Sequence, residues 1–240
     1  MGLGVEAAGI SKSYGGKVAL ANVSFRVEPG GLLAVLGPSG SGKSTLLYIL
    51  NKLERQDSGE VRFTSESGAA VDDGTLRRRT TLLLQRSVML KDSVYGNVAY
   101  GLRLRGMDEK EIQSRVHLAL KDMGLEGFEK RRASTLSGGE MQRVTFARAA
   151  VLEPEVIFLD EFTANLDPPN IKMLESALAG FRSKTGCTVV LVSHNPFQAQ
   201  RLARRCIYLY QGEVMYSGMI EAARADKDER MAAFFRGDLS

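Results

Sequence analysis

The sequence has few of the residues that build disulfide frameworks or metal clusters. Its 240 residues include two cysteines and two histidines. Cys187 and Cys206 lie in apolar segments that are typical of buried strands, so we expect two small core residues with free thiols in a reducing compartment. His117 lies in a helical segment, where we expect a solvated side chain. The cysteine content therefore argues against a disulfide-stapled fold and a cysteine metal site.

Long apolar runs are also absent. No stretch approaches the roughly 20 consecutive apolar residues that a membrane-spanning helix needs. Residues 1–10 lack the basic start and apolar run of a secretory signal. We therefore expect a soluble protein, and if it serves a membrane process, the membrane-spanning part is another chain.

Neither sign of charge is in large excess. The formal net charge is +4 at pH 7, with 25% charged and 44% hydrophobic residues, the balance of a soluble globular protein. Such a mildly basic chain suits an anionic ligand or an acidic lipid surface without requiring either. The basic runs at 77–79 and 130–132 are short, so we expect solvated faces. Aromatic residues do not interleave with them, which argues against a nucleic-acid partner.

Apolar runs and turn clusters alternate along the chain. Residues 32–36 form a continuous apolar run, as expected of a buried parallel strand. Residues 14–17 form a turn, which predicts an opening hairpin. Strands are predicted at 18–27, 32–36, 81–84, 156–159, 188–192, 206–210 and 213–216. Helices are predicted at 43–53, 108–123 and 140–151, from 168 onwards, between the strands at 188–192 and 206–210, and in the tail from 220.

This order of elements predicts an α/β fold with a mostly parallel sheet and helices on both faces. A helical block interrupts the alternation, and no internal repeat or low-complexity linker is present. We expect one domain over residues 1–240. Its core, at 1–86 and 154–240, carries an N-terminal antiparallel β subdomain, and a helical subdomain is inserted at 87–153.

A glycine-rich loop at residues 37–44 matches a phosphate-binding pattern and lies between a strand and a helix. Its glycines let backbone N–H groups point at phosphate oxygens, and the helix adds its positive end. Lys43 can reach the β- and γ-phosphates of a nucleoside triphosphate, and the Ser44 hydroxyl can bind Mg²⁺. The alternative is a glycine-rich turn without a ligand. The expected nucleotide-binding residues are Gly37, Pro38, Ser39, Gly40, Ser41, Gly42, Lys43, Ser44 and Thr45.

Two adjacent carboxylates end the apolar run at 156–159. Side chains alternate along a strand, so Asp160 and Glu161 point to different places. Asp160 is placed to hold Mg²⁺ through water, and Glu161 to polarise a water that attacks the γ-phosphate. The alternative is a pair of solvated acids in a turn.

The segment at 136–143, Leu-Ser-Gly-Gly-Glu-Met-Gln-Arg, resembles the signature of the ABC ATPases. It lies about 20 residues before Asp160, just ahead of a predicted helix. Its hydroxyl and N–H groups at a helix N-terminus form an anion site. The resemblance implies a P-loop NTPase fold that binds and hydrolyses ATP. It also implies that Ser137, Gly138 and Gly139 bind the γ-phosphate of ATP held by a second copy.

Other residues follow the family order between about residues 5 and 218. By resemblance, Tyr14 stacks on adenine, Gln85 senses the γ-phosphate and Mg²⁺, and His194 contacts the γ-phosphate. Asp167 belongs to a loop that crosses the dimer interface. A packed hairpin tyrosine and a plain polar loop residue remain alternatives for Tyr14 and Gln85. The implied catalytic residues are Lys43, Gln85, Glu161 and His194, and the implied metal ligands are Ser44, Gln85 and Asp160.

Three positions depart from the family pattern. Phe162 stands where proline usually follows the catalytic glutamate, Glu140 replaces the commoner glutamine, and Ser193 replaces a frequent threonine. None of these changes removes a reacting group. Phe162 puts the rate of hydrolysis in doubt more than the binding of ATP.

The resemblance implies a motor subunit of a membrane transporter, placed in the cytoplasm against the inner face of the cell membrane. Its implied partners are ATP, Mg²⁺, a second copy of itself in an ATP-sandwiched homodimer, transmembrane permease subunits and a separate solute-binding protein. The apolar stretch at 87–100 is a candidate docking surface for the permease, unless it makes internal helix contacts.

The segment at 85–103 looks most like importers of oxyanions, the tungstate type first and the phosphate type next. Three alternatives stay open: an importer of another small solute such as an amino acid, a soluble ABC ATPase that acts on DNA or ribosomes, and a small-molecule kinase that shares only the phosphate loop.

Overall fold

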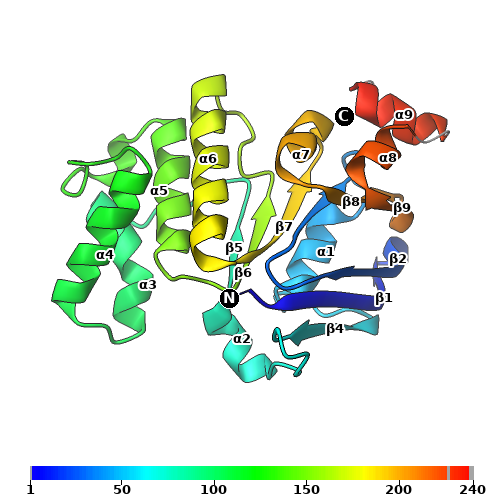
Figure 1. Ribbon diagram of the computed structural model, residues 1–240, viewed down its shortest axis with the longest axis horizontal. Helices are drawn as coiled ribbons and strands as arrows, with labels where there is room; N and C mark the ends of the chain where they lie inside the picture. Colours follow the sequence, from blue (N-terminus) through cyan, green and yellow to red (C-terminus); the bar gives the residue numbers. More distant parts are fainter. Residues whose placement is uncertain (1, 226–227, 238–240) are drawn as a thin grey trace. The chain divides into compact units, whose positions relative to one another are not determined.

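The computed structural model describes residues 2–225 and 228–237, which form two compact units (Figure 1). Each unit combines segments that are distant in the sequence, so the chain leaves and re-enters both. The subdomain boundaries expected near residues 87 and 153 stay a prediction. The first unit lies within residues 1–82, 155–161 and 186–240, and the second comprises 83–154 and 162–185.

A six-stranded sheet has the order β5-β6-β7-β3-β8-β9. The neighbours β6 and β7, β7 and β3, and β3 and β8 run parallel, whereas β9 is antiparallel to β8. The mostly parallel sheet predicted from the sequence is therefore confirmed. The strands are β3 (Leu32–Leu36), β5 (Thr80–Leu83), β6 (Val156–Asp160), β7 (Thr188–Ser193), β8 (Arg205–Tyr210) and β9 (Glu213–Met219).

The central strand β3 separates two apolar clusters, because its side chains alternate between the two faces of the sheet. Leu33 and Val35 pack into a cluster with α1 and the N-terminal strands. Ala34 and Leu36 pack into a second cluster with α7, α8 and α9. Helix α1 ends three residues before the predicted residue 53. These helices are α1 (Lys43–Leu50), α7 (Pro196–Leu202), α8 (Ile220–Arg224) and α9 (Glu229–Arg236).

The predicted opening hairpin is confirmed, since β1 pairs antiparallel with β2 across the two-residue turn Gly15-Gly16. Both glycines have positive φ, 55° and 83°, as a tight hairpin turn of this kind requires. A third strand, β4, pairs with β1, and the sequence reading missed it because only Val61 and Phe63 of this short strand are buried. These strands are β1 (Gly4–Tyr14), β2 (Lys17–Val27) and β4 (Ser58–Thr64).

A short helix that was not predicted from the sequence, α2 (Asp73–Arg79), is capped by Asp72, whose carboxylate accepts from the Gly74 N–H. The basic run at 77–79, which was expected to be solvated, includes the last residue of this helix, and at that residue the expectation is wrong. The Arg79 guanidinium makes two hydrogen bonds to the Glu155 carboxylate, of which the Nη2–Oε2 bond is 2.7 Å long. A paired arginine thus ties α2 to the start of β6.

The second unit is helical. Helices α3, α4 and α5 pack on one another, and α6 packs on α5. The predicted apolar face of α4 is buried at Ile112, Val116 and Leu120, and Gly124, at φ 63°, follows the last turn as a left-handed cap. These helices are α3 (Val94–Leu104), α4 (Glu109–Asp122), α5 (Gly138–Ala150) and α6 (Pro168–Thr185), with a 3₁₀ turn at Ala133–Thr135.

Two further expectations concern the environment of the chain. Cys187 and Cys206 are both buried and outside any disulfide of the described residues, and burial raises the pKa of Cys206 to about 12. Within the described residues, every helix falls short of the length and apolar character that crossing a bilayer requires.

Candidate nucleotide-binding site

The glycine-rich loop joins the end of β3 to the start of α1, and its backbone conformation depends on glycine. Gly37, Gly40 and Gly42 have φ values of 150°, 76° and 103°, which side-chain-bearing residues rarely adopt. A Cβ atom at Gly37 would collide with the Leu209 carbonyl, and one at Gly42 with the Ala19 carbonyl. The backbone therefore lies closer to its neighbours than any other residue would permit.

The Lys43 side chain is buried within this loop, with 6% of its surface exposed. Its ammonium donates to the Gly37 carbonyl at 2.8 Å and the Pro38 carbonyl at 2.7 Å. Burial lowers the pKa of Lys43, against the opposing field of Glu161 and Asp160. Among the described residues no carboxylate lies within ion-pair distance of this ammonium, so a bound anion would complete its charge balance.

A second polar group of the loop is left without a partner. The Ser41 hydroxyl is buried and has no hydrogen-bond partner among the described residues. A buried hydroxyl of this kind costs free energy unless a ligand or water pairs with it. Together, Lys43 and Ser41 fit a phosphate group, which accepts hydrogen bonds through several oxygens.

Acidic groups lie at the carboxyl end of β6, beside the loop. Asp160 is 7% exposed, and burial raises its pKa with help from Glu161. A hydrogen bond with Ser44 and the charge of Lys43 act in the opposite direction. The adjacent Ser44 and Asp160 oxygens form the hard donor set that Mg²⁺ takes beside phosphate oxygens.

Glu161 adopts a left-handed conformation, with φ at 45°. Its N–H donates to the Val192 carbonyl at 3.0 Å, and its Oε1 lies 2.7 Å from the His194 Nδ1. Such backbone strain persists where the surroundings hold it and is common at functional sites. The first unit therefore brings Lys43, Ser44, Asp160, Glu161 and His194 together.

Two residues expected to contact the nucleotide are exposed. Tyr14 lies at the hairpin turn with 46% of its surface exposed, and the Lys12 ammonium is 5.2 Å from its ring centroid. It is therefore not the packed tyrosine considered as an alternative. Gln85 is exposed in the second unit, two residues after β5 ends.

The signature segment caps α5. The Ser137 hydroxyl accepts from the Glu140 N–H at 3.3 Å, and the Glu140 carboxylate accepts from the Ser137 N–H at 2.7 Å. This capping box begins α5 at Gly138, two residues before the predicted start. The Glu140 carboxylate also pairs with Arg131 at 3.2 Å, so this run too is partly paired rather than solvated.

The same end of α5 approaches the start of α6 within the second unit. A Cβ atom at Gly139 would collide with the Asn170 amide, and this amide donates to the Asp167 carboxylate. The structure thus connects Gly139 with Asp167 through Asn170. The sequence reading missed Asn170, because no local pattern indicates such a contact.

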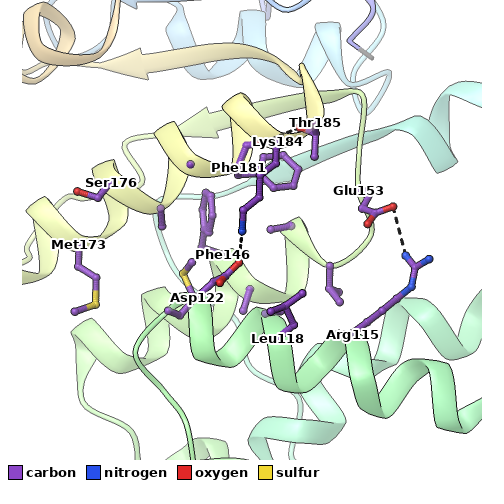
Figure 2. Close-up of a pocket in the computed structure, with 17 residues that line it drawn as sticks. Arg115, Leu118, Asp122, Phe146, Glu153, Met173, Ser176, Phe181, Lys184 and Thr185 are labelled. Atoms are coloured by element: carbon purple, nitrogen blue, oxygen red, sulfur yellow. Dashed lines mark hydrogen bonds and ion pairs between the residues drawn. The ribbon is translucent and has the colours of Figure 1, made fainter.

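The second unit also contains a cavity of about 530 Å³ bordered by α4, α5 and α6 (Figure 2). Apolar side chains such as Phe146 and Phe181 line it. Two ion pairs lie at its edges, Lys184–Asp122 at 3.0 Å and Arg115–Glu153 at 3.4 Å. None of the expected nucleotide-binding residues lines this cavity. Its mutually paired charges do not suit a polyphosphate.

Comparisons with known proteins agree with this geometry. The ABC transporter family model matches residues 20–164, which include the glycine-rich loop, the signature segment and the paired acids. The chain belongs to the ABC transporter family. This confirms the expected fold class and the resemblance on which it depended, and an ABC ATPase binds and hydrolyses ATP.

The relatives of this ABC ATPase include subunits of several importers. The tungstate uptake system ATP-binding protein TupC of Peptoclostridium acidaminophilum is 35% identical, over 88% of this chain and 96% of the relative. The phosphate import ATP-binding protein PstB 2 of Natronomonas pharaonis is 35% identical, over 98% of this chain and 87% of the relative. A spermidine/putrescine import ATP-binding protein, PotA of Mycoplasma capricolum, is 32% identical, over 97% of this chain and 66% of the relative.

A solved structure shows the same fold. CbiO1 of Clostridium perfringens, part of the ABC transporter complex cbiONQ, superposes with a TM-score of 0.83 at 27% identity. The match covers 97% of this chain and 94% of that chain. The agreement extends over the whole ABC ATPase, beyond its phosphate-binding loop.

Proposed function

We propose that this ABC ATPase powers an importer of an oxyanion such as tungstate or phosphate. The observation that carries the ATPase assignment is the buried Lys43 ammonium, which lies in a glycine-rich loop beside Asp160, Glu161 and His194. The tungstate and phosphate relatives, each 35% identical, support the class of cargo.

In the proposed mechanism, Lys43 and the N–H groups of the glycine-rich loop bind the phosphates of ATP. Ser44, Asp160 and Gln85 are the residues that would hold Mg²⁺, which would neutralise part of the charge of the phosphates. Glu161 polarises the attacking water, and His194 orients Glu161 through the 2.7 Å contact and faces the γ-phosphate. Hydrolysis is then accelerated by positioning and charge stabilisation.

The proposed working form is a homodimer with two molecules of ATP. Each site takes Lys43 and Glu161 from one copy and the Ser137 hydroxyl and Gly139 N–H from the other. Both Ser137 and Gly138 are exposed, as a group that binds a ligand of another copy must be. Hydrolysis removes the shared γ-phosphate, and the dimer opens to drive transport.

The proposed permease docking surface narrows to the exposed residues of segment 87–100. Val88 is 68% exposed, Leu90 38% and Tyr100 48%. Val94 is fully buried and Tyr95 donates to Glu109 at 2.8 Å, so these two residues make the internal contacts that were the alternative. Three apolar side chains in water remain available for a partner.

A crosslinking experiment tests this surface. We expect Val88→Cys to crosslink to permease subunits in the assembled transporter. Leu118→Cys, a change at a 57% exposed leucine of α4, should not crosslink. Equal crosslinking of both variants, or of neither, would count against this surface.

The remaining partners are a solute-binding protein and the inner face of the cell membrane, where the permease would hold this subunit in the cytoplasm. Reconstitution tests the cargo: the ATPase and its permease in liposomes should hydrolyse ATP faster when the binding protein carries tungstate or phosphate. Stimulation by a polyamine instead would favour another small solute, in line with the spermidine/putrescine relative at 32% identity. Stimulation by DNA or ribosomes would point to a soluble ABC ATPase.

A further inference from the structure

Gln142 is a buried polar residue on the inner side of α5, with 6% of its surface exposed. Both ends of its amide are paired. The Nε2 donates to the Phe162 carbonyl at 2.7 Å, and the Oε1 accepts from the Ser87 hydroxyl. Since all three residues belong to the second unit, these contacts lie within one compact body.

These bonds connect two segments that are far apart in the sequence. Ser87 lies two residues after Gln85, and Phe162 directly follows Glu161. Residues 87 and 142 are 55 positions apart, and 142 and 162 are 20 apart. One amide therefore joins the backbone next to two residues that are assigned to the γ-phosphate end of the site.

The backbone around Glu161 needs support from both sides, because Glu161 holds a left-handed conformation with φ at 45°. On one side, its N–H is held by the Val192 carbonyl of β7. On the other side, the Phe162 ring is completely buried and the Phe162 carbonyl is held by Gln142. An extra hydrogen bond at Phe162 can therefore fix the direction in which the Glu161 carboxylate projects.

We infer that Gln142 is a positioning residue for ATP hydrolysis, which holds the Glu161–Phe162 backbone in place and links it to the segment that follows Gln85. The inference rests on the proposed role of Glu161 as the group that polarises water. Gln142 does not contact the reacting atoms and acts only through the loop it anchors.

The main test compares Gln142→Met with the parent enzyme. Methionine has a similar length and removes both hydrogen bonds without adding a charge. We expect kcat for ATP hydrolysis to fall on the order of 10-fold, since small displacements of a catalytic group have large effects on rate. KM for ATP should stay within about 2-fold, because the phosphate loop is untouched.

A matched control lies one turn further along α5. Thr145 is also buried, but among the described residues its hydroxyl bonds only to the Met141 carbonyl of its own helix. Thr145→Val should keep the parent kcat once activity is normalised to folded protein.

Ser87, whose hydroxyl donates to the Gln142 Oε1, offers a second test. Ser87→Ala should lower kcat less than Gln142→Met, and Ser87→Thr should restore it. These Ser87 variants keep the inference testable should Gln142→Met fold poorly.

A double variant asks whether Gln142 acts through Glu161. Adding Gln142→Met to Glu161→Gln should lower the residual turnover no further. A further 10-fold fall, a parent-like kcat in Gln142→Met and Ser87→Ala, or an equal fall in Thr145→Val would overturn the inference. If Glu161→Gln itself hydrolyses ATP at the parent rate, the proposed role of Glu161 is wrong. If Glu161→Gln is inactive and Gln142→Met is fully active, only the inference is wrong.

Discussion

Lys43 and Asp160 are buried groups of opposite charge. The pKa of each is shifted in the direction that favours its uncharged form. Burial lowers the pKa of Lys43 and raises that of Asp160. Each group is buried, and among the described residues neither has an ion-pair partner, which is unfavourable for the charged forms unless a ligand binds. Displaced pKa values in a cluster of this kind are typical of functional sites.

Asp160 should therefore cost stability in the absence of nucleotide. Because its folded pKa lies above its unfolded value, the folded state binds more protons between the two values, and stability falls as pH rises through that window. We expect Asp160→Asn to stabilise the nucleotide-free protein at pH 7 by about 0.5–2 kcal/mol, the range that single stabilising substitutions commonly reach. Thermal melting between pH 4 and 8 measures this, with Glu126→Gln, a change at an exposed carboxylate, as the control. A variant that melts below the parent at pH 7 would contradict the argument.

Glu161 should matter for turnover rather than binding. Glutamine keeps the shape of the side chain but is a much weaker base, so we expect Glu161→Gln to bind ATP and to hydrolyse it on the order of 100-fold more slowly. Nucleotide binding and phosphate release are measured on the same preparation. Parent-like turnover would remove Glu161 from its assigned role.

At the scale of elements, the N-terminus of α5 has an observed structural role as a capped helix end and a proposed role in binding phosphate. Ser137 and Glu140 form a capping box, so the glutamate that departs from the family pattern has a structural role at this position. A hydrogen bond from the Ser137 backbone lowers the pKa of Glu140. The stabilisation is therefore present above the unfolded pKa and is lost as pH falls through the lowered folded value.

Ser137→Ala separates the two roles of this helix end. Loss of the cap should destabilise the protein by about 1 kcal/mol. Hydrolysis should fall much further than this loss of stability explains, because the hydroxyl is also proposed to contact the γ-phosphate. Glu140→Gln is the control, since glutamine can complete a capping box and leaves the Ser137 hydroxyl in place. Equal activity of both variants after correction for folded protein would argue against phosphate contact by Ser137.

At the scale of the whole molecule, Lys43 belongs to the first unit and Ser137 to the second, and the proposed site takes these two residues from different copies of the chain. The proposed anion site at the N-terminus of α5, where Ser137 and Gly138 are exposed, can act only if a phosphate reaches it from elsewhere. The dimer is thus part of the proposed enzyme rather than a packing arrangement.

We expect Glu161→Gln to form a dimer with ATP and Mg²⁺ and to remain a monomer without them, since bound ligand shifts the equilibrium towards the state that binds it. Adding Ser137→Glu places a carboxylate against the γ-phosphate and should abolish the dimer. Light scattering after size-exclusion chromatography gives the mass in each case. A strictly monomeric Glu161→Gln at high concentration with ATP would refute the shared site.

The sequence alone determined where the main elements lie and which residues are candidates for the chemistry. The buried strands at 32–36 and 156–160 and the glycine-rich loop were predictable because each depends on a local pattern of apolar residues or glycines. Strand β4 and helix α2 were missed because their local patterns are weak.

Only the tertiary structure decided how the candidates are held. Three features depend on neighbours that are remote in sequence or on burial that no local pattern specifies. They are the buried Ser41 hydroxyl without a partner among the described residues, the left-handed backbone of Glu161, and the hydrogen bond from Gln142 to Phe162. Hydrogen bonds and desolvation act between atoms in space, whereas periodicity along the chain reports only the nearest turns and strands.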